Sequence, residues 1–201
     1  MTTLVKICGL TDAAAVNAAV LSGADAVGFV FAESVRRLQP SRAIEISGDV
    51  PANVKRVAVM LHPTPSEWEE VRETFSPDVL QADIEDFADL VVPDDIERWP
   101  VIREGRVATD RAVPTTFVYE GTSSGSGQKV DWSKAAELAR RGNMILAGGI
   151  SAGNVAAAIR EVAPFGVDVS SAVESAPGKK DVNKIQAFME AVKAAQQETS
   201  S

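Results

Sequence analysis

Short apolar runs alternate with helix-like segments along the chain of 201 residues, roughly 25 residues apart. The runs lack a strict alternation of apolar and polar positions, which is typical of strands that are covered on both faces of a sheet. This pattern predicts eight strands. They are expected at residues 4–8, 26–31, 55–61, 78–82, 100–105, 114–120, 144–149 and 166–171.

Residues typical of helix starts stand between these runs. They are Thr11, Pro40, a capping-box pair of Ser66 and Glu69, Asp131, and Val182 at the start of a last helix. Residues 84–99 and 106–112 carry little helical pattern, so we expect helices four and five to be eroded. The polar tail 196–201 is expected to fray.

Eight strand–helix units predict a single (β/α)8 TIM barrel that spans residues 1–201 as one domain. The alternative is a doubly wound open sheet. Its glycine-rich dinucleotide turn is missing, because CGLTDAA follows the first strand where GxGxxG would stand.

Composition narrows the function classes. The chain has 20 Lys and Arg against 28 Asp and Glu, a formal net charge of −8, which argues against nucleic acids and anionic membrane surfaces as partners. No run of 18 apolar residues is present, and the first residues do not resemble a signal peptide. The single cysteine is consistent with a reducing compartment, so we expect a cytoplasmic enzyme-sized domain.

In a barrel, the active site lies at the C-terminal ends of the strands. Gly148 and Gly149 follow the seventh strand and precede a helix start, and Ser170 and Ser171 end the eighth strand. Loops in these two places commonly bind phosphate, although both could be tight turns that serve only the fold. Gly127, in the loop GTSSGSG, is also expected to bind phosphate. That loop is either a lid over the site or only a connection between elements.

Cys8 and Glu120 end the first and sixth strands. Taken alone, each has an ordinary interpretation, as a small buried hydrophobe and a solvated carboxylate. Taken together, a thiolate base and a carboxylic acid could move protons between adjacent carbons. Arg36 or Arg37 could bind a carboxylate through a bidentate fork, or both could be surface charges.

His62, the only histidine, follows the third strand. It is interpreted either as a loop residue or as an acid–base group. One histidine and one distant cysteine do not make a zinc site, so no metal is expected.

Six motifs occur in order along the chain: KICGLTD at 6–12, GADAVGFVF at 23–31, SVRRLQP at 34–40, GSGQKVDW at 125–132, LAGGI at 146–150, and DVSSAVE…PGKKD at 168–181. This combination resembles the phosphoribosylanthranilate isomerase family of tryptophan biosynthesis. The resemblance implies an Amadori rearrangement of a phosphoribosyl substrate, N-(5-phosphoribosyl)anthranilate, without metal or cofactor.

The resemblance also implies roles for individual residues. Cys8 matches the family base and is expected to be partly ionised near neutrality, with Lys6 on the same strand face helping to hold a thiolate. Arg36, rather than Arg37, matches the arginine that binds the substrate carboxylate. Asp168 matches a substrate-contacting aspartate. Gly149, Ser170 and Ser171 match phosphate-binding positions.

Two departures from the family pattern concern the general acid. The family has an aspartate where this chain has Glu120, and it reads VQLHG where this chain reads LQADI. The glutamine of the family pattern is therefore kept as Gln81, and Asp83 takes the histidine position. Both are expected to bind the substrate, as are Lys6, Arg36 and Asp168. Glu120 is the expected acid, its pKa raised by burial under substrate, and Asp83 is the alternative.

Three further alternatives stay open. The first is a related phosphosugar barrel isomerase, either of the histidine pathway or with dual substrates, which should have a glycine-rich loop after the third strand, where this chain reads LHPTPSE. A non-catalytic barrel subunit is the second alternative. The third concerns assembly, since both a monomer and a homodimer are compatible with the sequence.

Overall fold

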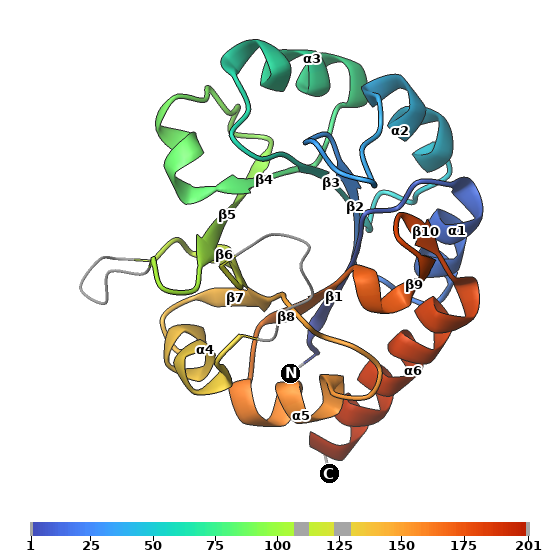
Figure 1. Cartoon of the computed structure of the whole chain (residues 1–201), viewed down its shortest axis with the longest axis vertical. Helices are drawn as coiled ribbons and strands as arrows, with labels where there is room; N and C mark the ends of the chain where they lie inside the picture. Colours follow the sequence, from blue (N-terminus) through green and yellow to red (C-terminus); the bar gives the residue numbers. More distant parts are fainter. Residues whose placement is uncertain (1, 107–112, 123–129, 200–201) are drawn as a thin grey trace.

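The computed structural model describes residues 2–106, 113–122 and 130–199 and forms a closed barrel of parallel strands (Figure 1). The strands pair in chain order, and β1 also pairs with β8, which closes the ring. They are β1 (Leu4–Cys8), β2 (Ala26–Val30), β3 (Lys55–Val59), β4 (Val79–Asp83), β5 (Glu97–Arg103), β6 (Thr116–Glu120), β7 (Asn143–Leu146) and β8 (Gly166–Val169). The predicted (β/α)8 barrel is confirmed, and the open-sheet alternative is excluded because this sheet has no edge.

The strand ends differ from the prediction by a few residues, for local reasons. β7 stops at Leu146 instead of continuing to 149, because Gly148 and Gly149 adopt positive φ values of 84° and 67° that a strand cannot contain. β8 stops at Val169, since a short 3₁₀ helix, η2 (Ser171–Val173), starts directly after it.

Six α-helices surround the barrel in Figure 1 within the described residues. They are α1 (Ala13–Leu21), α2 (Pro40–Ser47), α3 (Pro65–Phe75), α4 (Trp132–Ala139), α5 (Val155–Val162) and α6 (Val182–Thr199). None of the helices that the structure describes is long and apolar enough to cross a membrane.

Two predicted helix caps are wrong by one or two residues. Asp12, not Thr11, caps α1, and its carboxylate accepts a hydrogen bond from the Ala15 N–H at 2.9 Å. The capping box of α3 joins Thr64 and Glu67 rather than Ser66 and Glu69, because Pro65 occupies the first helical turn and the cap must precede it. Asp131 caps α4 as predicted.

Erosion of the fourth helix is confirmed, since β4 is followed by a 3₁₀ helix, η1 (Ile84–Ala88). The described parts of the β5–β6 connection, 104–106 and 113–115, contain no helix, and 107–112 lie outside the described residues. At the C-terminus, α6 extends to Thr199 and so into the tail expected to fray. Ala195 is buried, and the Gln196 side-chain amide donates to the Thr3 carbonyl at 3.0 Å, which ties this last part of the helix to the barrel.

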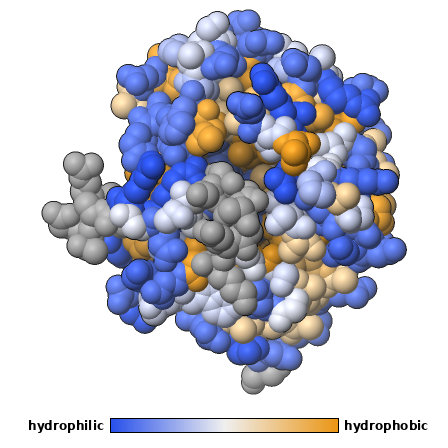
Figure 2. Space-filling model, viewed as in Figure 1, coloured by the Kyte–Doolittle hydropathy of each residue, from blue (hydrophilic) through white to orange (hydrophobic). Residues whose placement is uncertain are grey.

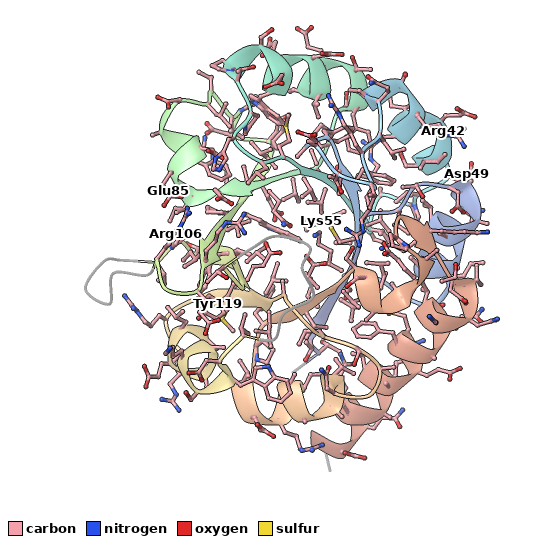
Figure 3. The ribbon with its side chains drawn as sticks, viewed as in Figure 1. Arg42, Asp49, Lys55, Glu85, Arg106 and Tyr119 are labelled. Carbon is pink, nitrogen blue, oxygen red and sulfur yellow. The ribbon has the colours of Figure 1, made fainter. Side chains whose placement is uncertain are left out.

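The apolar core has two parts. The larger lies between the strands and the surrounding helices, and the smaller fills the barrel interior (Figure 3). The interior cluster consists of Ala26, Val57, Val79, Trp99, Val101, Val118, Ile145 and Ala147. Because side chains alternate along a strand, the residues two positions beyond Val101 and Val118 face the same interior. These are Arg103 and Glu120, so polar groups lie above the apolar cluster at the C-terminal end.

The capping box of α3 allows a direct test. Replacing Thr64→Ala removes the oxygen that accepts from the Glu67 N–H, and should lower the free energy of unfolding by about 1 kcal/mol. In a chain of this size, the loss should appear as a decrease of roughly 2–4 °C in Tm. Ser66→Ala is the matched control and should leave Tm unchanged. Equal effects of the two variants would contradict the assignment.

Candidate active site

A cavity of about 390 Å³ opens at the C-terminal ends of the strands. Figure 2 shows mainly hydrophilic side chains over this face of the molecule. Most residues predicted for the site line this cavity: Cys8, Arg36, Gln81, Asp83, Glu120, Gly148, Gly149, Asp168, Ser170 and Ser171. Of the other two, Lys6 is fully buried in the barrel interior and Gly127 lies outside the described residues.

Lys6 and Asp168 form an ion pair inside the barrel. They are register partners on β1 and β8, and the Lys6 ammonium donates to an Asp168 oxygen at 2.7 Å. Cys8 lies two residues further along β1, and a Cβ atom at Gly28 would contact both Lys6 and Cys8, which confirms the prediction that the two residues share a strand face. Burial lowers the pKa of Lys6, but the charges of Asp168 and Cys8 outweigh it and raise the pKa, so Lys6 stays protonated.

Gly28 on the neighbouring strand makes room for this arrangement. A Cβ atom at Gly28 would lie 3.0 Å from both the Cys8 sulfur and the Lys6 Cε. A Cβ atom there would be in tight contact with the thiol and with the Lys6 side chain, which would have to yield slightly to admit it. The glycine in the sequence GADAVGFVF has a packing role that its motif alone did not reveal.

The expected ionisation of Cys8 is wrong for the protein without substrate. Burial raises the pKa of the Cys8 thiol, and the charge of Lys6 lowers it only in part. The reason is that Asp168 compensates the Lys6 charge and itself disfavours a nearby thiolate. The raised pKa favours the neutral thiol of Cys8 near pH 7.

Glu120 and Asp83 meet at one arginine. The Arg103 guanidinium binds Asp83 in a bidentate pair, with Nε to Oδ2 at 2.9 Å and Nη2 to Oδ1 at 2.5 Å. Its Nη1 lies 3.5 Å from a Glu120 oxygen. Asp83 is almost completely buried, whereas Glu120 is partly exposed to the cavity. Arg103 was expected among the residues at the strand ends that could act on a small anionic substrate, but no specific site role was assigned to it from the sequence.

His62 lies at the edge of this chemistry, since its Nε2 is 4.0 Å from an Asp83 oxygen. Its side chain is 62% exposed, its Nδ1 is 2.9 Å from an Asp86 oxygen, and its backbone has a φ of 48°. The hydrogen bond with Asp86 raises the pKa of His62. The ring lines a second cavity together with Arg37, outside the one that contains Cys8. The interpretation of His62 as a loop residue is therefore favoured.

Arg36 reaches the first cavity with its guanidinium held by Glu174. Arg36 Nε and Nη2 donate to the two Glu174 oxygens at 2.6 and 2.9 Å. Glu174 starts β9 (Glu174–Ala176), which pairs with β10 (Lys179–Lys180) in a small antiparallel sheet. Burial raises the pKa of Glu174, but hydrogen bonds from Arg36 and Lys180 outweigh it and bring the pKa to about 2. Glu174 and Lys180 were given no site role on sequence grounds.

The two turns expected to bind phosphate lie at the cavity. Asn154, before α5, accepts the Ser151 N–H at 2.8 Å and donates to the Gly149 carbonyl at 2.8 Å, so its side chain fixes the turn. That side chain makes no capping hydrogen bond to α5 among the described residues, and N–H groups at such a helix start favour anions. Ser170 and Ser171 stand at the start of η2.

This fold and site define a class: single-domain (β/α)8 barrel enzymes with polar and ionisable groups gathered at the C-terminal end of the strands. A family model described as N-(5'-phosphoribosyl)anthranilate (PRA) isomerase matches residues 5–191. The chain belongs to this family.

Individual relatives agree over nearly full length. An N-(5'-phosphoribosyl)anthranilate isomerase of Listeria monocytogenes is 37% identical over 94% of this chain and 98% of its own. A Thermus thermophilus phosphoribosyl anthranilate isomerase structure has a TM-score of 0.83 at 28% identity, covering 96% of this chain and 99% of its own. A third, in complex with reduced 1-(o-carboxyphenylamino)-1-deoxyribulose 5-phosphate, has a TM-score of 0.80 at 32% identity, covering 96% and 100%.

The electrostatics of the thiol can be tested by titration. Because the chain has one cysteine, thiolate absorbance in the ultraviolet reports Cys8 alone, with Cys8→Ser as the blank. We expect a midpoint above pH 9 in the unliganded protein. Asp168→Asn should lower that midpoint, since it removes a negative charge, and Lys6→Met should raise it. Shifts in the same direction in both variants would contradict this account.

Proposed function

We propose that this protein catalyses the Amadori rearrangement of N-(5-phosphoribosyl)anthranilate to 1-(2-carboxyphenylamino)-1-deoxyribulose 5-phosphate, a step of tryptophan biosynthesis. The observation that carries the proposal is that one cavity brings together the Cys8 thiol, the Glu120 carboxylate, Arg36 and two anion-binding turns. The expected setting is the cytoplasm, with the protein as a monomer or a homodimer.

The two ends of this substrate are anionic, and the cavity has a cationic or N–H-rich group for each. The phosphate is proposed to bind at Gly148, Gly149, Ser170 and Ser171, where backbone N–H groups and hydroxyls can donate to its oxygens. The anthranilate carboxylate is proposed to bind Arg36, whose guanidinium has five N–H groups and gives two of them to Glu174. Gln81, Asp168 and the alkyl walls of the cavity contact the ribosyl part between them.

The chemistry needs one acid and one base. In the proposed first step, protonated Glu120 gives its proton to the furanose ring oxygen, the C1–oxygen bond breaks, and the ring opens to a Schiff base. Before the second step, the neutral Cys8 thiol releases its proton to solvent. The resulting thiolate takes the proton from C2, and the electron pair moves to give the enolamine, which tautomerises to the ketose. Lys6 supports the thiolate because its positive charge lowers the pKa of the Cys8 thiol.

The contacts favour Glu120 over Asp83 as the acid. Both Asp83 oxygens are engaged by Arg103, and a carboxylate in a bidentate pair with a guanidinium is poorly suited to carry a proton. Glu120 contacts Arg103 through one oxygen at 3.5 Å. In this proposal, Asp83 binds Arg103 and so weakens the interaction of Arg103 with Glu120.

The direct experiment is an assay with N-(5-phosphoribosyl)anthranilate generated in situ, following the loss of its fluorescence. Turnover without added metal is the expected result. Absence of turnover, with folded protein, would contradict the proposal. Activity on the histidine-pathway aminoaldose alone would favour that isomerase, and binding without turnover would favour a non-catalytic barrel.

Removing the base should abolish most of the rate. Cys8→Ser keeps the size of the side chain but replaces a thiol by a much weaker acid, so kcat should fall by a factor on the order of 10²–10⁴. The Tm should change little, because the volume is nearly conserved. Turnover close to that of the unaltered protein would exclude Cys8 as the base.

A pair of isosteric variants separates the two candidate acids. Glu120→Gln should lower kcat by a factor on the order of 10²–10⁴, since the amide has no proton of suitable acidity. Asp83→Asn should lower Tm more than Glu120→Gln does, because it breaks a buried pair with Arg103, and its kcat should fall less. The acid is Asp83 instead if Asp83→Asn is the more damaging of the two to kcat.

A further inference from the structure

The β9–β10 hairpin contains two charged residues that the proposed chemistry does not use. Glu174 and Lys180 are buried, with 5% and 0% of their side chains exposed. Figure 1 shows the hairpin outside the barrel, near α1. Burying charged groups is costly unless they are paired, so their placement calls for a reason in the site beside them.

The Glu174 carboxylate lies between two cations. Besides the bidentate pair with Arg36, its Oε1 accepts from the Lys180 ammonium at 2.8 Å. Two cations and one carboxylate leave one net positive charge, which suits a site for anions. Arg36 cannot turn away without giving up both hydrogen bonds to Glu174.

Lys180 connects this cluster to Ser170. Its ammonium donates to the Ser170 carbonyl at 3.0 Å and to the Ser170 hydroxyl oxygen at 3.2 Å. A hydroxyl has one hydrogen, and an ammonium can only donate. The Ser170 hydroxyl therefore accepts from Lys180, and its own hydrogen is left to point toward another acceptor, such as a phosphate oxygen in the adjoining cavity.

The hairpin is also packed directly on the segments that carry these groups. A Cβ atom at Gly178 would lie 2.6 Å from the Val35 carbonyl oxygen, and one at Gly9 would lie 2.4 Å from Arg36 Cδ. Both glycines have positive φ values, of 79° and 72°. The Thr11 hydroxyl donates to the Gly178 carbonyl at 3.0 Å. The hairpin, the Arg36 loop and the end of β1 are thus held as one unit.

We infer that Glu174 and Lys180 are positioning residues that set the spacing between Arg36, which binds the substrate carboxylate, and Ser170, which binds its phosphate. The inference rests on the proposed function, because it assigns these two anions to the two ends of one substrate. The hairpin thereby selects a substrate whose anions are the correct distance apart.

The first test compares two substrates. Glu174→Gln keeps the shape of the side chain but replaces one carboxylate oxygen by an amide NH2 group, which cannot accept a hydrogen bond. One amide oxygen cannot accept from Arg36 Nε, Arg36 Nη2 and Lys180 at once, so at least one of these three hydrogen bonds is lost. For N-(5-phosphoribosyl)anthranilate, KM should rise about tenfold while kcat changes less than about threefold. For N-(5-phosphoribosyl)aniline, which lacks the carboxylate, KM should rise less, because only the link through Lys180 to Ser170 is then disturbed. Glu174→Asp, which keeps the charge, should recover part of the loss.

The second test uses inorganic phosphate, measured by calorimetry, and does not depend on turnover. Lys180→Met should weaken phosphate binding about tenfold, since the Ser170 hydroxyl is no longer oriented. Lys179→Met is the matched control, because Lys179 is the exposed neighbour on the same strand, and it should bind phosphate normally. Lys180→Arg, which keeps the charge, serves if Lys180→Met does not fold.

The outcomes separate this inference from the proposed function. An equal rise in KM for both substrates in Glu174→Gln would show a merely structural role and overturn the inference. Normal phosphate binding by Lys180→Met would overturn it as well. The unaltered protein could instead bind phosphate normally without turning over the substrate, while Lys180→Met binds phosphate more weakly. That result would overturn the proposed function but would support the link from Lys180 to Ser170.

Discussion

The buried pair of Lys6 and Asp168 is the interaction on which both the fold and the site depend. It joins β1 to β8, the two strands whose pairing closes the barrel. An ammonium with no exposed surface is stable only if a carboxylate balances it, so closing the barrel and satisfying this charge are one event. The positive charge of the same ammonium lowers the pKa of the Cys8 thiol, against the larger effect of burial.

The other charged groups of the site follow the same physical rule. Three cations at the C-terminal end of the barrel are held by carboxylates: Arg103 by Asp83, and Arg36 and Lys180 by Glu174. In a partly enclosed cavity, groups fixed in this way need little rearrangement when a substrate binds, which favours catalysis by pre-positioned charges. The departures from the family pattern also become intelligible, because Asp83 and Glu120 share one arginine between them.

The fold and much of the cavity could be predicted because they depend on local patterns. Apolar runs separated by helix starts predict parallel strands, and a barrel gathers their C-terminal ends, which brings Cys8, Glu120 and Ser170 together. Helix caps were less certain, since more than one nearby residue fits the same pattern, and a proline one position away decided between Thr64 and Ser66. The roles of Arg103, Glu174 and Lys180 escaped sequence reasoning because their partners lie on other elements.

The amino-acid sequence alone specified the eight-stranded plan, the family and the identity of the candidate base, since these depend on periodicity and on motifs in order along the chain. Three properties of the site were decided only by the tertiary structure. They are the raised pKa of Cys8, the bidentate pair of Asp83 with Arg103, and the hydrogen bonds between Glu174 and Arg36. These properties depend on distances of a few ångströms and on exclusion of water. Strand register and packing determine these distances and the exclusion of water, and they cannot be deduced from any short stretch of the sequence.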